Sequence, residues 1–600
     1  MPELTWNNKY DLTGRRRPPL RVALPFQTVE TVNESVQDRQ RSLDSLAEER
    51  AWRNRLIWGD KKYVLPSLLS EFSEAVDVIY IDPPFFTGDD FSFSVSVNGE
   101  QFDRKPTLIE QKAYRDTWGS GIDGYLTWFH DTLIHLRQLL KETGSIYVHL
   151  DWHVGHYAKL VLDEVFGSGN FRNEIVWHYY NKFQGNVRRF ASDHDTIFWY
   201  SKSASYRFAP VKEKRPEGPV SQIKRKWDKS SGRIVNVKGP DGKVIYQETD
   251  ERTVDDVWRL PMLQPADKKE NLGYPTQKPK SIIERILLAS TEKGDLVLDC
   301  FVGSGTTAEI AEKMGRRWIV ADLGRFAVHT TRKRLLALSE VTPFVVQNLG
   351  KYERQLWQTA EFGETTTVRA AAYRKFILDL YHATLVTGYL WLHGLKKGRM
   401  VHVGTVDAPV TAGDVRQIVE EFQKAIGTGK DAPKVKGIDI LGWDFAFELN
   451  EVARQNAEQA GIDLRLIRIP REVLEKRAVE QGDVRFFELA ALSVGIRQAG
   501  YQITLTIDDF VIPLDDVPAD VQKAVTHWSL WIDYWAVDWD NRSDTFHNEW
   551  QAYRTRKSSS LTLAAEHDYS EAGEYVIVVK VIDILGNDTT KALTVTIDGP

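Results

Sequence analysis

Three carboxylates in this sequence follow short apolar runs, and each stands where a buried strand would end. Asp82 closes VIYI and precedes two prolines and two phenylalanines. Asp299 closes LVL before the glycine-rich stretch CFVGSGTT, and Asp322 closes RWIVA. Ligands of open α/β sheets bind outside the carboxyl ends of the strands. These three acids are therefore the first candidates for a functional site.

The segment after Asp299 is suited to close approach by a ligand. Gly303 and Gly305 lack side chains, and a helix beginning near Thr306 would offer free N–H groups. The spacing is neither the G-x-G-x-x-G of dinucleotide binders nor a Walker loop, which needs a lysine. Asp322 stands where an acid commonly binds ribose hydroxyls. Together these residues predict a nucleoside ligand without a long phosphate tail, and S-adenosylmethionine fits that description.

Asp82 lies at a rigid turn. Pro83 and Pro84 cannot continue a strand ladder, and the first proline keeps Asp82 extended. Taken alone, this tripeptide is better explained as a strand stop with an exposed acid. The surrounding elements have to decide between the two interpretations.

Strand and helix patterns alternate from about residue 55 to 165, give way to a basic, turn-rich stretch, and resume before the glycine loop. This predicts a doubly wound, Rossmann-like α/β sheet interrupted by an insertion. A second α/β-like segment follows, and then an all-β end similar to a PKD-like or immunoglobulin-like sandwich. We expect the parts after about residue 360 to be separate modules that the chemistry does not need. The predicted boundaries are an N-terminal extension 1–50, a central domain 51–350 with an insertion at 170–270, an α/β accessory domain 360–515 and a β-sandwich-like domain 516–600.

Four ordered motifs resemble the amino-methyltransferases of DNA. The stretch from Asp82 to Phe85 is similar to their catalytic D-P-P-Y/F signature, and LDCFVGSGTT to their cofactor loop, with Cys300 where proline is usual. GYPTQKP (273–279) is similar to the segment before that loop, and the stretches from 143 to 203 are similar to type III modification subunits. The order, with the catalytic signature first, the insertion next and the cofactor loop last, resembles the β class. The resemblance implies a methyltransferase domain whose insertion recognises the DNA target.

The resemblance gives the turn at Asp82 a chemical role. An exocyclic base amine is a poor nucleophile because its lone pair is delocalised into the ring. An ionised Asp82 and the carbonyl of Pro83 can both accept hydrogen bonds from that amine, and the prolines hold these acceptors in place beforehand. Phe85 can stack on a base that has flipped out of the duplex. Aspartate at the first position resembles adenine-N6 enzymes, whereas serine is more usual in cytosine-N4 enzymes.

Two further groups of residues complete the predicted site. The residues expected to bind the cofactor are Asp60, Lys278, Asp299, Phe301, Gly303, Gly305, Thr306 and Asp322. Of these, Asp60 is equally well explained as a helix N-cap, and the resemblance places the loop of Lys278 against the methionine part of the cofactor. The residues expected to contact DNA are Arg188, Arg189, Lys224, Arg225 and Lys226. A solvated loop is the alternative for this basic stretch.

Other suggestive residues are given structural interpretations. His149, His153 and His156 have zinc-like spacing, but they do not share one helical face, so we expect no metal site. The aromatic strip from Trp528 to Trp539 is better explained as a sandwich core than as a binding surface. The single cysteine, Cys300, excludes an intrachain disulfide.

Composition limits the remaining possibilities. With 600 residues the chain should hold two to four domains, and 42% hydrophobic and 27% charged residues fit a globular protein. The net charge of −6 does not indicate nucleic-acid binding, although it can hide a basic face. We find no apolar run of transmembrane length and no apolar core of a signal peptide near the start. We therefore expect a cytoplasmic protein without a membrane partner.

The sequence thus predicts an S-adenosylmethionine-dependent, site-specific adenine-N6 DNA methyltransferase that flips its target base, in a restriction-modification or phage-defence system. Its expected partners are double-stranded DNA, a restriction or helicase subunit and a second copy of the chain. Cytosine-N4 methylation stays open as an alternative, as does a DNA-recognition subunit with little activity of its own.

Overall fold

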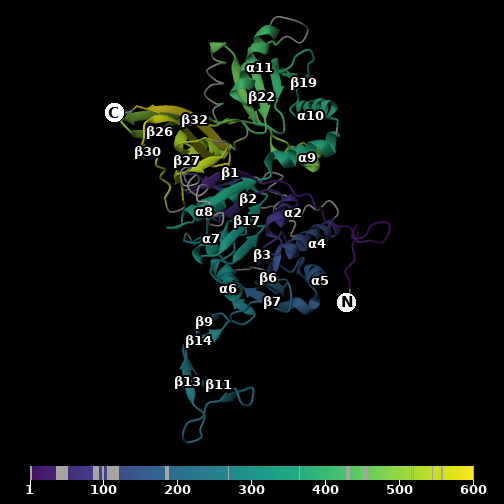
Figure 1. The fold of residues 1–600 in the computed structure, drawn as a ribbon, viewed down its shortest axis with the longest axis vertical. Coiled ribbons are helices and arrows are strands. Elements are labelled where there is room, and N and C mark those ends of the chain that lie inside the picture. The colour runs from purple at the N-terminus through teal and green to yellow at the C-terminus, as the bar shows by residue number, and fades with distance from the viewer. Residues whose placement is uncertain are drawn as a thin grey trace.

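The protein is described by a computed structural model (Figure 1). The described residues are 3–34, 52–85, 93–97, 100–104, 121–182, 188, 190–215, 217–267, 269–363, 365–426, 433–447, 449, 457, 459–514, 517, 519–542, 545–555 and 558–598.

One large mixed sheet organises the first half of the chain. Its strands run in the order β15-β7-β8-β6-β3-β16-β17-β2-β18-β1-β28. All neighbours from β6 to β18 are parallel, whereas β8 is antiparallel to both β6 and β7. The six parallel strands are β2 (Asn54–Trp58), β3 (Val76–Ile81), β6 (Leu140–Leu150), β16 (Leu296–Asp299), β17 (Arg317–Asp322) and β18 (Phe344–Asn348).

Helices cover both faces of this sheet, which confirms the predicted doubly wound architecture. One apolar core packs against α2 (Lys61–Phe72), α4 (Ile122–Leu139) and α5 (Gly155–Phe166). The other packs against α6 (Lys280–Ser290), α7 (Thr306–Lys313) and α8 (Arg325–Leu336). The central strands are apolar on both sides because both faces are buried. The strand order reverses between β3 and β16, which is where such folds bind ligands.

The part that leaves the sheet is shorter than the predicted insertion 170–270. β7 (Phe171–His178), β8 (His194–Ser201) and β15 (Val257–Arg259) all belong to the central sheet. Only the chain between β8 and β15 projects outward, as a long arm that extends away from the domain (Figure 1). The arm consists of three two-stranded ribbons: β9 (Lys212–Lys214) with β14 (Glu251–Thr253), β10 (Val220–Ile223) with β13 (Tyr246–Thr249), and β11 (Arg225–Asp228) with β12 (Arg233–Asn236).

A smaller α/β unit follows the central domain. Its sheet has the order β19-β20-β21-β22-β23-β24, with β21, β22 and β23 parallel. The strands are β19 (Thr384–Leu385), β20 (Gly394–Lys396), β21 (Arg399–Val403), β22 (Gly437–Gly442), β23 (Asp463–Arg468) and β24 (Phe487–Glu488). The helices are α9 (Gly350–Phe362), α10 (Thr366–Leu380), α11 (Ala412–Ala425) and α13 (Lys476–Gln481).

The chain ends in the predicted sandwich, which begins earlier than expected. One sheet contains β25 (Ala491–Ala499), β26 (Gln502–Val511) and β30 (Ala564–Asp568). The other contains β29 (Trp550–Tyr553), β27 (Ile532–Asp538), β31 (Gly573–Asp583) and β32 (Asp588–Ile597). β25 and β26 lie in the range 360–515, so the predicted boundary at 516 is too late. Trp531, Trp535 and Trp539 are buried in the core of the sandwich, as expected.

The sandwich is not separate from the central domain. β28 (Phe546–Asn548) pairs with β1 (Gln27–Val32), which in turn pairs with β18. The predicted N-terminal extension thus contributes a strand to the sheet. Glu30 on β1 is fully buried and bonds both Arg332 of α8 and Lys580 of β31, at 2.8 and 2.7 Å. One apolar core runs through this junction.

Candidate active site

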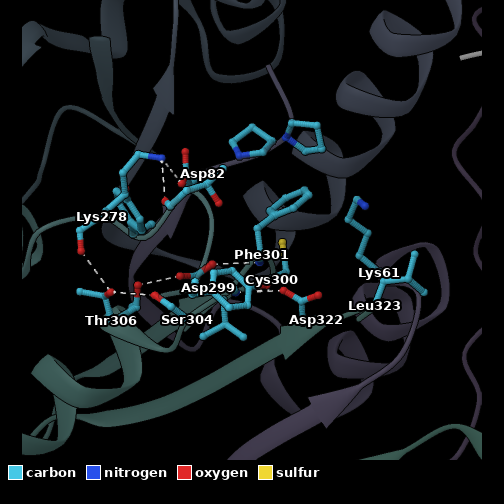
Figure 2. A pocket seen from close by; sticks show the side chains of 18 of the residues that line it. Lys61, Asp82, Lys278, Asp299, Cys300, Phe301, Ser304, Thr306, Asp322 and Leu323 are labelled. Atoms are coloured by element: carbon cyan, nitrogen blue, oxygen red, sulfur yellow. Dashed lines mark hydrogen bonds and ion pairs between the residues drawn. The ribbon is translucent and has the colours of Figure 1, made fainter. Parts of the chain in front are cut away.

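A pocket opens at the carboxyl ends of β2, β3, β16 and β17 (Figure 2). It encloses about 960 Å³ of empty space, part of it open to solvent. Asp82 and Lys278 lie at one end, and Lys61, Asp322 and Leu323 lie at the other. The predicted site residues that line it are Asp82, Pro83, Pro84, Phe85, Lys278, Asp299, Phe301, Gly303, Thr306 and Asp322.

The two glycines of the loop have different structural roles. Both adopt the left-handed backbone, with φ of 51° at Gly303 and 81° at Gly305. A Cβ on Gly305 would lie 2.9 Å from the Cα of Thr331, so this glycine permits α7 to pack against α8. A Cβ on Gly303 would point toward the ring of Tyr274, 3.4 Å away, on the pocket side. Gly303 is therefore the glycine that keeps the pocket open.

Asp299 fixes the shape of the loop. Its two oxygens accept hydrogen bonds from the backbone N–H of Phe301 at 2.9 Å and from the hydroxyl of Thr307 at 2.6 Å. Burial raises the pKa of this carboxyl to about 7. Because both oxygens are already bonded within the loop, Asp299 acts mainly by holding the loop at the strand end.

Asp322 connects two loops at the other end of the pocket. It accepts from the N–H of Gly303 at 2.9 Å and from the N–H of Gly324 at 2.8 Å. Burial raises its pKa to about 6, and these hydrogen bonds and the charge of Lys61 oppose that rise. The carboxylate can accept hydroxyl hydrogen bonds through its remaining lone pairs.

Asp82 has one oxygen engaged and one available. Its Oδ2 forms an ion pair with the ammonium of Lys278, a residue from the loop before α6. Its Oδ1 is buried, and no hydrogen-bond partner for it exists among the described residues. A buried carboxylate oxygen without a donor is costly, so a donor from a ligand would be favourable there.

The turn after Asp82 is held from outside the strand. The hydroxyl of Tyr125, on α4, donates to the carbonyl of Pro84 at 3.1 Å. The ammonium of Lys278 lies 5.0 Å from the ring centre of Phe85. The aromatic ring and the available oxygen therefore face the same end of the pocket.

Comparison with known proteins agrees with the kind of site that the sequence predicted at this pocket. Residues 76–333 match the family model of the N6/N4 DNA methylases. These residues form a DNA methylase domain.

Similar proteins include the type II methyltransferase M.EcaI of Enterobacter cloacae, which is 27% identical over an alignment of 330 positions. The alignment covers 47% of this chain and 69% of the relative. A Mod subunit of the type III enzyme StyLTI from Salmonella typhimurium is 26% identical over 44% of this chain and 50% of its own length. Among solved structures, the M1.HpyAVI–SAM complex is 18% identical, with a TM-score of 0.30, over 47% of this chain and all of that chain.

Some residues of the methylase pocket were not anticipated from the sequence. Lys61, the first residue of α2, lies over the rings of Trp128 and Phe301, at 4.3 and 4.6 Å from their centres. Tyr274 stacks on Phe326, with the ring centres 6.0 Å apart. Lys61 directly follows a strand-ending WGD, which was the one available signal.

Asp60 has the structural role that the sequence left open. Its side chain accepts from the N–H of Lys62 at 3.0 Å and so caps the N-terminus of α2. It is not among the residues that line the pocket, although Gly59 and Lys61 on either side of it are. Gly305 also lies outside the lining, as its packing against α8 explains.

The expected DNA-contacting residues of the methylase lie in two places. Arg188 is exposed in the connection between β7 and β8, and Arg189 falls outside the described residues. Lys224, Arg225 and Lys226 are exposed at and just before β11, toward the tip of the arm. Of the predicted DNA contacts, Lys224, Arg225 and Lys226 thus lie far out on the arm.

Two absences hold for the described part of the chain. It contains no group of three or more histidine, cysteine or acidic residues arranged to hold a metal ion. None of its helices combines the length and the apolar character that a bilayer crossing requires.

Proposed function

We propose that this chain transfers the methyl group of S-adenosylmethionine to the N6 amine of adenine within a specific DNA sequence, as part of a restriction-modification or phage-defence system. The observation that carries the proposal is the state of Asp82. One oxygen is held by Lys278, and the other is buried, without a partner among the described residues, in a pocket that also contains a glycine loop and Asp322.

The donor set of the pocket fits this cofactor. S-adenosylmethionine supplies a methyl group on a positively charged sulfur, which an amine can attack. Asp322 would accept hydrogen bonds from the ribose hydroxyls, and Gly303 leaves room for close approach. Lys61 over Phe301 closes the nucleoside end. The glycine loop contains no lysine that could neutralise a phosphate chain. This favours a ligand that has no phosphate chain.

At the other end, the chain's own residues prepare the amine. Oδ1 of Asp82 accepts an N–H of the base, and the second acceptor is the carbonyl of Pro83. Lys278 holds the carboxylate in place through their ion pair, so that it needs no reorganisation during the reaction. Phe85 stacks on the flipped base and partly offsets the lost stacking in the duplex. The proton of the amine then passes to Asp82 or to solvent.

Arg188 and the arm would bring the DNA to this pocket. Residues 220–246, at the outer part of the arm, contain seven lysines and arginines but only two aspartates. Trp227 and Ile234 oppose each other across the β11–β12 ribbon and are 61% and 65% exposed. A basic two-stranded ribbon with exposed apolar side chains has the dimensions to enter a DNA major groove. The arm would contact DNA away from the target base, because it points away from the domain.

One experiment separates the alternatives. The purified chain is incubated with labelled S-adenosylmethionine and DNA, and the digested nucleosides are identified by mass spectrometry. N6-methyladenine is the expected product, whereas N4-methylcytosine would establish the alternative substrate. A chain that binds cofactor and DNA without forming either product would be a recognition subunit that needs a restriction or helicase partner, as the similarity to a type III Mod subunit suggests.

A further inference from the structure

A buried histidine lies directly behind Phe85. His149, on β6, is 0% exposed and does not line the pocket. Its ring centre is 6.1 Å from that of Phe85, and the two rings are inclined by only 31°. On another side, the ring of Trp177 meets it edge-on at 5.5 Å. His149 is therefore packed between the catalytic turn and the strands beyond it.

Hydrogen bonds fix both ring nitrogens of His149. The hydroxyl of Tyr80 lies 3.0 Å from Nδ1, and Oδ2 of Asp195 lies 3.3 Å from Nε2. Because the carboxylate of Asp195 can only accept, Nε2 carries a ring proton and donates it. In the neutral ring, Nδ1 then accepts from the hydroxyl of Tyr80. The ring can neither flip nor rotate without losing both bonds.

The chain of hydrogen bonds crosses three adjacent strands. Tyr80 lies on β3, two residues before Asp82, which directly follows that strand. Both side chains therefore leave the same face of the sheet. His149 lies on β6 and Asp195 on β8, where Asp195 also accepts from the hydroxyl of Tyr179 at 3.3 Å. Burial would raise the pKa of Asp195, but the hydrogen bond from His149, the charge of Lys278 and the hydrogen bond from Tyr179 lower it overall.

We propose that His149 is a positioning residue for Phe85. Its ring is held between Tyr80 and Asp195 and forms the fixed surface on which Phe85 packs. His149 thereby sets the angle at which Phe85 holds the flipped base beside Asp82. The inference rests on the proposed function. A buried polar chain of this kind could instead serve only to hold the sheet together. The two roles differ in what a substitution changes.

The test uses the full chain, after the target sequence has been found by mapping modified bases. His149→Phe keeps a ring of similar size but removes both hydrogen bonds, and His149→Gln removes the ring. Either variant should lower kcat/KM for DNA by about twofold to tenfold, the value of one well-oriented aromatic contact. The affinity for S-adenosylmethionine, measured by calorimetry, should not change. A DNA duplex with 2-aminopurine at the target should show brighter fluorescence, because the flipped base stacks less well.

A matched control lies on β8. Tyr200 donates to Asp163 at 2.7 Å and is fully buried, but it does not line the pocket. Tyr200→Phe therefore removes a comparable buried bond, and it should lower the melting temperature without changing kcat/KM. If Tyr200→Phe and the His149 variants lower the melting temperature alike and leave kcat/KM unchanged, His149 is merely structural and the inference is wrong.

A double-mutant cycle shows whether His149 acts through Phe85. In a Phe85→Leu background, His149→Phe should change kcat/KM by less than about twofold, because the contact it supports is already gone. An undiminished effect in that background would overturn the inference. Should the His149 variants fail to fold, Asp195→Asn, which keeps the side-chain shape, replaces them in the same cycle. A parent protein without methyl transfer would refute the proposed function instead, so the two failures are distinguishable.

Discussion

Replacing Asp82 by alanine is the most direct test of the proposed chemistry. The substitution removes both acceptors that the carboxylate presents, the oxygen bound to Lys278 and the buried Oδ1. Loss of a preorganised polar group at a reaction centre typically costs a factor of about 10²–10³ in rate, or about 2.7–4 kcal/mol. We therefore expect single-turnover methyl transfer to fall by at least about a hundredfold.

The ion pair complicates the interpretation, and the structure indicates how to correct for it. The side chain of Lys278 is only 10% exposed, so Asp82→Ala leaves a nearly buried ammonium without its carboxylate. That charge would disfavour a cationic cofactor. Asp82→Ala combined with Lys278→Met removes both charges and should restore cofactor affinity without restoring the rate. A recovered rate in the double variant would show that Asp82 serves only to neutralise Lys278.

The assay compares rate and cofactor affinity in the same proteins. Methyl transfer to DNA is followed with labelled S-adenosylmethionine, and cofactor binding by calorimetry. Lys141→Met is the control. It breaks the 2.7 Å ion pair between Lys141 and Asp77, which lies on β3, the strand that Asp82 follows, but outside the pocket. It should leave both quantities unchanged. A rate for Asp82→Ala within tenfold of the parent would refute the role of Asp82.

Four further predictions follow from single contacts. Gly303→Ala should weaken cofactor binding because its Cβ would enter the pocket near Tyr274, whereas Gly305→Ala should chiefly lower the melting temperature because its Cβ would meet Thr331. Cofactor affinity should fall as the pH is lowered through about 6, where Asp322 takes up a proton, and Asp322→Asn should bind weakly with no such dependence. Neutralising Lys224, Arg225 and Lys226 together should flatten the salt dependence of DNA binding by roughly 0.9 log units for each lost phosphate contact, with cofactor binding unchanged. Glu30→Gln should reduce the free energy of unfolding in denaturant by about 3–5 kcal/mol, because Arg332 and Lys580 lose their shared buried counter-charge.

The part of the site that depends on local pattern was accessible from the sequence. Asp82 directly follows a buried strand, and Asp299 and Asp322 each end one. Parallel strands bring these carboxyl ends to one edge of the sheet. The glycine spacing likewise indicated a close approach, although only the structure shows that Gly305 serves helix packing rather than the pocket. A pattern of residue types cannot distinguish a glycine needed by a ligand from one needed by a neighbouring helix.

The supporting residues could not be found in this way. His149 and Asp195 are 46 residues apart and meet only because β8 is antiparallel to β6. The strand that carries Asp195, β8, has an apolar pattern, but the basic stretch after it led to its range being assigned to the insertion. The histidine was considered only as a metal ligand, because that is the chemistry that sequence spacing can suggest.

The C-terminal half has apolar cores of its own, but it also shares surfaces with the central domain that the sequence did not indicate. Its α/β and all-β patterns do predict two further folds, but patterns describe elements and not the surfaces that elements share. β28 has only three residues, too few for any periodicity, yet it extends the central sheet through β1. Asp588 of the sandwich accepts from Arg325 of α8 at 3.2 Å and from Arg468 of the accessory unit at 3.0 Å.

That junction also reaches the cofactor end of the pocket. Arg325 lies over the ring of Trp58 at 4.8 Å, and the indole N–H of Trp58 donates to the carbonyl of Leu323 at 3.0 Å. Leu323 lines the pocket next to Asp322. A single carboxylate, Asp588, therefore connects all three folded units to the pocket wall beside Asp322. Because this wall is held partly from outside the methylase domain, the C-terminal half belongs to the framework of the site even though none of its described residues lines the pocket.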